Sequence, residues 1–113
     1  MERTNVKKIQ TYLGFCIRAG KIAFGVDNAE KQKKGVFLLL ADEGLGASSF
    51  KTIVKLKEKF ACPTLILEGG LLAELVHRPA VKAAAVKDEN LAAAILAASE
   101  GESQIKIHSG GNN

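Results

Sequence analysis

An unbroken apolar run constrains the fold of this chain more than any other feature of its sequence. The run extends from Val36 to Ala41, and Gly35 and Asp42 bound it. A strand with one face in water alternates apolar and polar residues, so a continuous apolar run indicates a strand that is buried on both faces. Such a strand needs other elements to cover both faces of its sheet.

The rest of the chain alternates helix signals with strand signals. The clearest helix is expected over residues 5–19, where Asn5 can act as the N-cap. Its apolar residues recur at spacings of three and four: Val6, Ile9, Leu13, Cys16 and Ile17. Further helices are expected at residues 27–34, 48–61, 71–76 and 90–98. Asp27 or Asn28 can cap the first of these, Ser48 or Ser49 the second, and Asp88 the last.

Strands are expected at residues 21–24, 36–41, 64–67 and 81–86, so strands alternate with helices. This alternation favours an α/β fold, a three-layer α/β/α sandwich around a mostly parallel four-stranded sheet. Residues 1–98 would form this single domain. Residues 99–113 are rich in Gly, Ser and Asn and are expected to be a flexible tail, in which residues 105–107 could add an edge strand.

Composition agrees with one intracellular domain. The chain has 113 residues, of which 47% are hydrophobic, which is enough for a real core without a disulfide or a metal. Cys16 and Cys62 lie in apolar surroundings and are expected to be buried, reduced thiols, which fits a cytoplasmic protein. No signal peptide and no membrane-spanning stretch are visible.

Positive charge is concentrated at one end of the chain. Residues 1–34 contain eight Lys or Arg against three acids, a surplus of +5, whereas the whole chain carries +4. A cluster of this kind indicates a polyanionic partner, and a solvated surface is the plain alternative.

Signals for catalysis, metal binding and cofactor binding are weak. The only nucleophile and base pair would be Cys16 or Cys62 with His77, and neither cysteine has a local motif. No metal-ligand spacing and no phosphate-binding glycine motif are present. Asp42-Glu43 could hold a small ligand at the end of a strand, but a polar loop explains the pair better. We expect no enzyme activity and no cofactor.

The segment from Arg18 to Gly35 carries more information. Gly25 stands between a short strand and a short helix, where a glycine allows another backbone to approach closely. Lys31 follows on the same helix, with Lys33 and Lys34 beyond it. Lysines there would bind phosphates in a salt-sensitive and largely sequence-independent way. Because the five Phe and one Tyr lie mostly in apolar runs, base-stacking platforms are not expected, and recognition of a folded RNA by shape fits better.

The same segment resembles the ribosomal L-seven-Ae/L-thirty-e family, especially its small stand-alone bacterial members. The resemblance rests on the following stretches: Leu13-Gly14-Phe15-Cys16-Ile17-Arg18-Ala19-Gly20-Lys21, Gly25, Val36 to Glu43, Cys62 to Leu67, and Val81 to Leu96. It implies a three-layer α/β/α fold that binds kink-turn RNA without catalysis. Two features differ from the family pattern, namely the acidic Asp27 and a stretch about three residues shorter between Gly25 and Val36.

The resemblance also implies the site. Gly25, Asp27, Asn28 and Lys31 would contact the kinked RNA, and a second contact would come from the loop of Val76, His77, Arg78 and Pro79. The complete set of RNA-binding residues that we predict is Arg18, Lys21, Gly25, Asp27, Asn28, Lys31, Lys34, His77 and Arg78. The expected partner is ribosomal or other structured RNA, with no DNA and no membrane, and the free protein is expected to be a monomer. A protein-interaction module on the same fold is the alternative.

Overall fold

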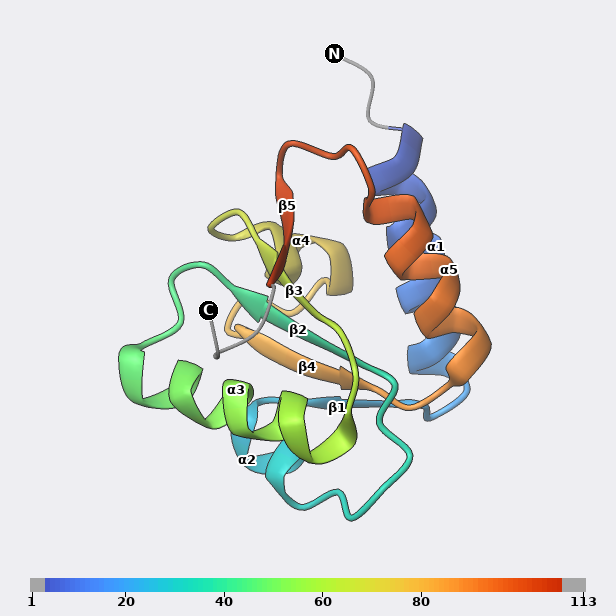
Figure 1. Ribbon diagram of the computed structural model, residues 1–113. Helices are drawn as coiled ribbons and strands as arrows, with labels where there is room; N and C mark the ends of the chain where they lie inside the picture. The colour runs from blue at the N-terminus through green and yellow to red at the C-terminus, as the bar shows by residue number, and fades with distance from the viewer. Residues whose placement is uncertain (1–3, 109–113) are drawn as a thin grey trace.

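The structure, a computed structural model, describes residues 4–108 and shows a mixed α/β fold (Figure 1). Its elements follow in this order: α1 (Thr4–Arg18), β1 (Ile22–Phe24), α2 (Val26–Glu30), β2 (Leu38–Asp42), α3 (Ala47–Phe60), β3 (Thr64–Leu67), α4 (Leu71–Val76), β4 (Ala83–Val86), α5 (Glu89–Ser99) and β5 (Ile105–His108). The expected alternation of helices and strands is therefore present.

The sheet differs from the predicted one in strand number and in direction. It has five strands in the order β1-β4-β2-β3-β5. Only β2 and β3 pair in parallel, whereas β1–β4, β2–β4 and β3–β5 are antiparallel. The prediction of a mostly parallel four-stranded sheet is wrong.

The short helix α4 explains the change of direction. At six residues it spans roughly 9 Å, too little to carry the chain back along the sheet to the edge where β3 begins. The chain instead enters β4 at the edge where β2 ends, and there the amide of Asp42 donates to the carbonyl oxygen of Lys82 at 2.8 Å. A strand that starts at this edge must run antiparallel to β2.

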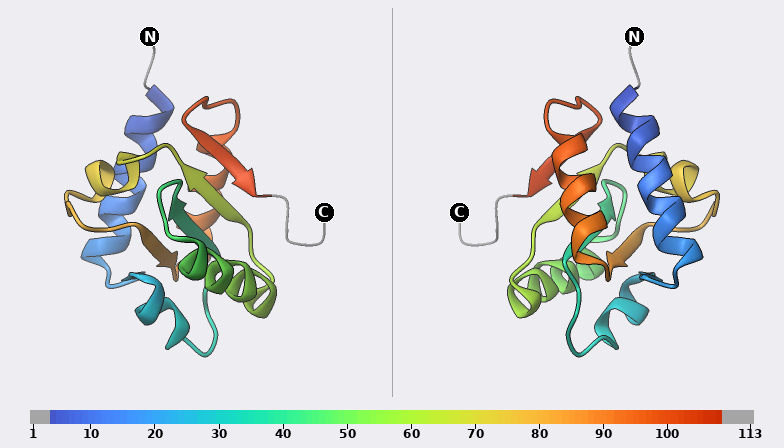
Figure 2. Two further views of the ribbon diagram at one scale, coloured as in Figure 1. Left: turned by 90° about the vertical axis from the view of Figure 1, so that its left-hand side faces the viewer. Right: turned by 90° about the vertical axis from the view of Figure 1, so that its right-hand side faces the viewer.

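Helices cover both faces of the sheet (Figures 1 and 2), as the apolar run predicted. Leu38 and Leu40 of β2 pack into a core with α1, α4 and α5, while Leu39 points to the other face and packs with α2 and α3. All five residues of β2 are buried. Alternate residues of β2 therefore pack against the helices on opposite faces of the sheet.

Three of the four predicted helix caps differ from the structure. Asp88 caps α5 as predicted, because its carboxylate accepts a hydrogen bond from the amide of Leu91 at 2.8 Å. Helix α1 begins at Thr4, so Asn5 lies inside it. Glycines precede the other two helices, Gly25 before α2 and Gly46 before α3, and neither helix has a side-chain cap. Helix α2 also ends at Glu30, earlier than predicted.

The segment assigned to a tail contributes to the sheet. The predicted edge strand is confirmed as β5, which pairs with β3 and places Ile105 in the core. Residues 109–113 of the predicted tail lie outside the described residues. Within residues 4–108, no helix is long and apolar enough to cross a membrane.

Candidate functional site

Gly25 connects β1 to α2 in a conformation that only glycine adopts readily. Its φ of 89° and ψ of 154° fall in a region that is closed to residues with a Cβ atom. Its amide donates to the carbonyl oxygen of Ala83 at 2.8 Å, which ties the turn to β4. Apart from Gly25 and its two neighbours in the chain, no heavy atom lies within 4 Å of the position that a Cβ would take. The outer side of the turn is thus open to an approaching ligand.

Two contacts shape the first turn of α2. The side-chain amide of Asn28 donates to the carbonyl oxygen of Phe24 at 2.8 Å, and the amide of Ala29 donates to the carbonyl oxygen of Gly25 at 3.0 Å. The Asn28 side chain therefore supports the turn with one N–H group. Both Asp27 and Asn28 are exposed beside it.

A hollow of about 420 Å³ opens directly beside this turn. It is lined by the turn, by the start of α3 and by the residues that lead into β4: Phe24, Gly25, Val26, Asp27, Asn28, Leu45, Ser49, Ala80, Lys82 and Ala83. Lys82 and Ser49 were not among the predicted site residues. Lys82 lies opposite the turn only because β4 runs antiparallel to β1, a pairing that the sequence prediction did not contain.

Arg78 joins the second predicted contact loop to the turn. Its guanidinium lies over the ring of Phe24, 4.5 Å from the ring centre, in cation–π geometry. Phe24 is the residue immediately before Gly25, and both lie in or beside the hollow. Segments that are more than fifty residues apart in the sequence therefore meet at one place.

His77 does not face the turn. It ends α4 in the left-handed conformation, with φ of 56°, and its Nε2 lies 3.2 Å from the side-chain nitrogen of Gln10 on α1. The structure thus separates His77 from its neighbour Arg78, although the sequence placed both in one contact loop.

The predicted basic residues lie in three places. Lys31 is exposed at the C-terminal end of α2. Lys34 lies farther along, beside a second hollow near the end of α3. Arg18 and Lys21 lie before β1, at the opposite end of that strand from Gly25, and the carbonyl oxygen of Lys21 accepts a hydrogen bond from the amide of Lys87 at 2.8 Å. The first third of the chain therefore does not form one continuous basic patch around Gly25.

The acidic pair at the end of β2 holds loops in place. The buried carboxylate of Asp42 accepts hydrogen bonds from the amides of Gly44 and Gly70, both at 2.7 Å. Glu43 accepts one from the amide of Gly69 at 3.0 Å. These contacts join the loop after β2 to the loop after β3, which is a structural role.

The two cysteines are free and buried, as predicted. Burial, together with the negative charge of Asp88, raises the pKa of the Cys16 thiol to about 11. Burial also raises the pKa of Cys62. Both thiols are therefore protonated at neutral pH and poor nucleophiles. In residues 4–108, no group of three or more His, Cys, Asp or Glu side chains could hold a metal ion.

Comparisons with known proteins bear on the fold alone. Neither a scan against protein-family models nor a search of curated proteins finds a match. A solved structure of a protein with unknown function from Bacillus halodurans is similar, with a TM-score of 0.67 and 18% sequence identity. The similarity covers 80% of this chain and 95% of that chain. The chain thus shares its α/β fold with that protein, and the resemblance to the L-seven-Ae/L-thirty-e family stays a prediction.

Proposed function

We propose that this protein is a non-enzymatic, cytoplasmic RNA-binding protein that recognises kink-turn-like structured RNA through the strand, turn and helix at Gly25. The observation that supports the proposal best is the meeting of the Gly25 turn with Arg78 through the ring of Phe24. The resemblance to the L-seven-Ae/L-thirty-e family implies RNA contacts from these same two segments. Their proximity in space is what a single RNA-binding surface requires.

The turn at Gly25 is open to solvent and has positively charged side chains near it. Lys82 lines the hollow beside the turn, Arg78 lies over the ring of Phe24, and Lys31 is the C-cap residue of α2; all three are exposed and carry positive charge. No Cβ obstructs the backbone of Gly25, so a sugar-phosphate chain can approach it closely. Cations around an open backbone segment suit phosphate contacts, which position an RNA without reading its sequence.

Asp27 and Asn28 give the surface a means of selection. Both lie in the hollow beside the turn, and both are exposed. A carboxylate accepts hydrogen bonds from base amino groups but repels phosphates, so Asp27 favours a base edge over a backbone at its position. This property distinguishes a kinked RNA, which presents unpaired base edges, from a regular duplex.

Replacing Lys31 by alanine is expected to weaken binding of a kink-turn RNA more than replacing Lys57 does. Lys31 is exposed next to the proposed surface, and loss of a single phosphate contact lowers affinity by roughly threefold to tenfold at moderate salt. Lys57 is half-buried on α3 near Cys62, away from the turn. Fluorescence anisotropy with a labelled kink-turn RNA measures both affinities.

Lys57→Ala removes the same charge and serves as the matched control for that experiment. The Lys31 variant should unfold within about 0.5 kcal/mol of the wild type, because substitutions of exposed side chains have small effects, and thermal unfolding checks that the variant of the half-buried Lys57 also folds. Equal losses for the two variants would show that the site is misplaced. A wild type without measurable affinity for the kink-turn RNA would contradict the function itself.

A further inference from the structure

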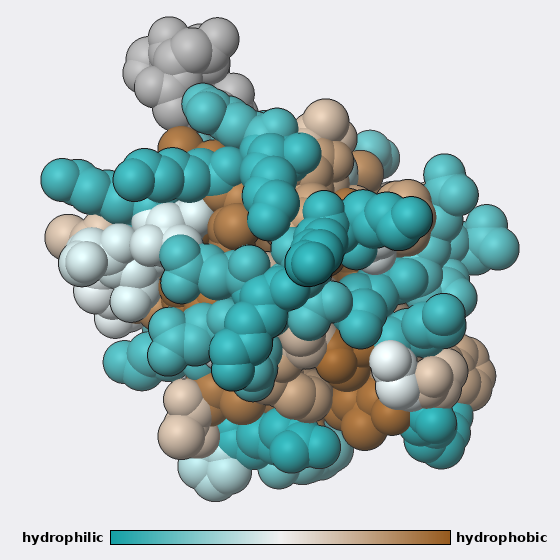
Figure 3. Space-filling view, turned by 90° about the horizontal axis from the view of Figure 1, so that it is seen from below, coloured by the Kyte–Doolittle hydropathy of each residue, from teal (hydrophilic) through white to brown (hydrophobic). Residues whose placement is uncertain are grey.

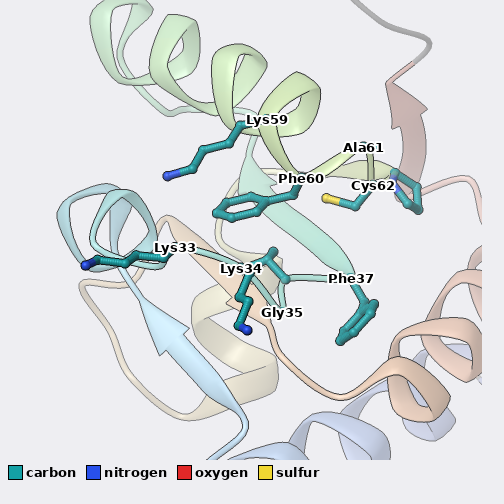
Figure 4. Close-up of a pocket in the computed structure, with 10 residues that line it drawn as sticks. Lys33, Lys34, Gly35, Phe37, Lys59, Phe60, Ala61 and Cys62 are labelled. Carbon is teal, nitrogen blue, oxygen red and sulfur yellow. The ribbon is translucent and has the colours of Figure 1, made fainter.

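A second basic hollow lies at the C-terminal end of α3, between that helix and the loop that leads from α2 to β2 (Figure 4). Its volume is about 280 Å³. Three lysines line it, Lys33 and Lys34 from the loop and Lys59 from α3, and no acidic residue does. The loop that follows α2 therefore contributes Lys33 and Lys34 to a second, positively charged hollow.

The ring of Phe60 forms one wall of this hollow. Figure 4 shows the ring between the loop and α3, with the side chain of Lys59 beside it. The Lys59 ammonium lies 5.1 Å from the ring centre and donates to the carbonyl oxygen of Gln32 at 3.0 Å. These contacts hold Lys59 on α3 against the loop. The thiol of Cys62, whose pKa burial raises, adds no negative charge to the hollow.

Lys33 and Lys34 are exposed and contact no acidic side chain of the described residues. A lysine that is paired with a carboxylate is already neutralised, whereas these two retain their full charge. Three lysines that line one concave surface attract a phosphate more strongly than the same residues scattered over a convex one. The chemistry of the hollow thus favours a phosphate group over a neutral ligand.

The two hollows lie at the two ends of α3 on the same side of the sheet. The first is lined by Ser49 near the start of α3, and the second by Lys59 near its end. The helix axis between these residues is roughly 15 Å long. Seen from below, many hydrophilic side chains spread over the molecule, with apolar areas between them (Figure 3). A nucleic-acid strand could follow this face from one hollow to the other.

From this arrangement we infer that the hollow of Lys33, Lys34 and Lys59 binds a backbone phosphate of the RNA at a distance from the Gly25 turn. The inference rests on the proposed function and extends its footprint. The Gly25 turn contacts the kink, and the stem that leaves the kink passes along α2 and α3 to the second hollow. Contacts at the second hollow add affinity without adding sequence preference.

The test compares two triple variants on two kink-turn RNAs, one with a short stem and one with a long stem. Replacing Lys33, Lys34 and Lys59 by glutamine is expected to weaken binding of the long-stem RNA by about tenfold, and to reduce the slope of log affinity against log salt by about 1, as loss of one phosphate contact requires. Binding of the short-stem RNA should change far less, because that RNA does not reach the second hollow. Anisotropy titrations at several salt concentrations measure both quantities.

The control variant replaces Lys7, Lys8 and Lys106 by glutamine. These lysines are equally exposed and their loss removes the same charge, but they lie on α1 and on β5. Thermal unfolding checks that both variants fold. The inference is overturned if the two triple variants bind the long-stem RNA equally well, or if the first variant loses affinity for both RNAs to the same extent. The preference of the wild type for kinked over unkinked RNA, read in the same titrations, reports on the proposed function separately.

Discussion

Replacing Asp42 by alanine is expected to lower the free energy of unfolding by about 2–4 kcal/mol, because the amides of Gly44 and Gly70 would each lose a charge-assisted hydrogen bond. Asp42 is only 5% exposed, so water reaches the vacated position poorly. The loop after β2 would also loosen, and this loop carries Leu45, which lines the hollow beside Gly25. Urea or thermal unfolding measures the loss of stability.

Asp27→Ala provides the control for Asp42, since it removes an exposed carboxylate that lines the hollow beside Gly25. Its free energy of unfolding should stay within about 0.5 kcal/mol of the wild-type value. If Asp42→Ala is no less stable than Asp27→Ala, then Asp42 does not hold the two loops together. An acidic pair with a ligand-binding role would become the better interpretation.

Gly25→Val is expected to reduce affinity for a kink-turn RNA by roughly tenfold to a hundredfold, which corresponds to about 1.4–2.8 kcal/mol of binding free energy. Valine strains the backbone at φ of 89°, and this strain costs on the order of 1–3 kcal/mol of stability. Its side chain would also fill the open space through which the RNA backbone approaches. Anisotropy titration and thermal unfolding of the same preparation separate the two effects.

Gly101→Val distinguishes the loss of binding from a general loss of stability. Gly101 has a φ of 81° and, like Gly25, open space at its Cβ position, but it follows α5. We expect a similar decrease in stability and an unchanged affinity for RNA. If both valine variants lose affinity equally, strain alone explains the loss, and Gly25 has no particular role in binding.

Much of the secondary structure follows from the sequence because the signals are local. The expected strand at residues 64–67 and the expected helix at 71–76 coincide with β3 and α4. The apolar run predicted correctly that β2 is buried on both faces, but the strand begins at Leu38 and Phe37 is exposed, so the predicted strand of residues 36–41 began too early. Caps were harder to predict, because Ser48 and Ser49 are good cap residues but the chain begins α3 after Gly46. Helix α3 therefore begins after Gly46 without a side-chain cap.

Strand direction could not be predicted from the alternation of elements. Alternation is typical of parallel sheets, but a helix must be long enough to return the chain before a parallel strand can form. Helix α4 is too short, and the alanines of β4 give no signal of direction. Because β4 pairs with β1 in the antiparallel direction, Lys82 reaches the Gly25 hollow. Lys82 was therefore not among the predicted site residues because the predicted strand direction was wrong.

The candidate site was predictable in part. The geometry of Gly25 and the proximity of Arg78 agree with the segments that the resemblance named, whereas His77 faces α1 and Lys34 lies beside the second hollow. Spacing along the chain identified a candidate segment but not the direction of each side chain. That direction depends on the left-handed end of α4 and on the early end of α2, and neither has a clear local signal.

The most direct test of the central claim is a titration of the wild-type protein against a kink-turn RNA and an unkinked duplex of the same composition, at several salt concentrations. The proposal predicts tighter binding of the kinked RNA at every salt concentration, and weakening of both complexes as salt increases. The preference for the kink should persist at high salt, because it depends on shape and on the contacts around Gly25. Equal affinity for the two RNAs, or no binding to either, would contradict it.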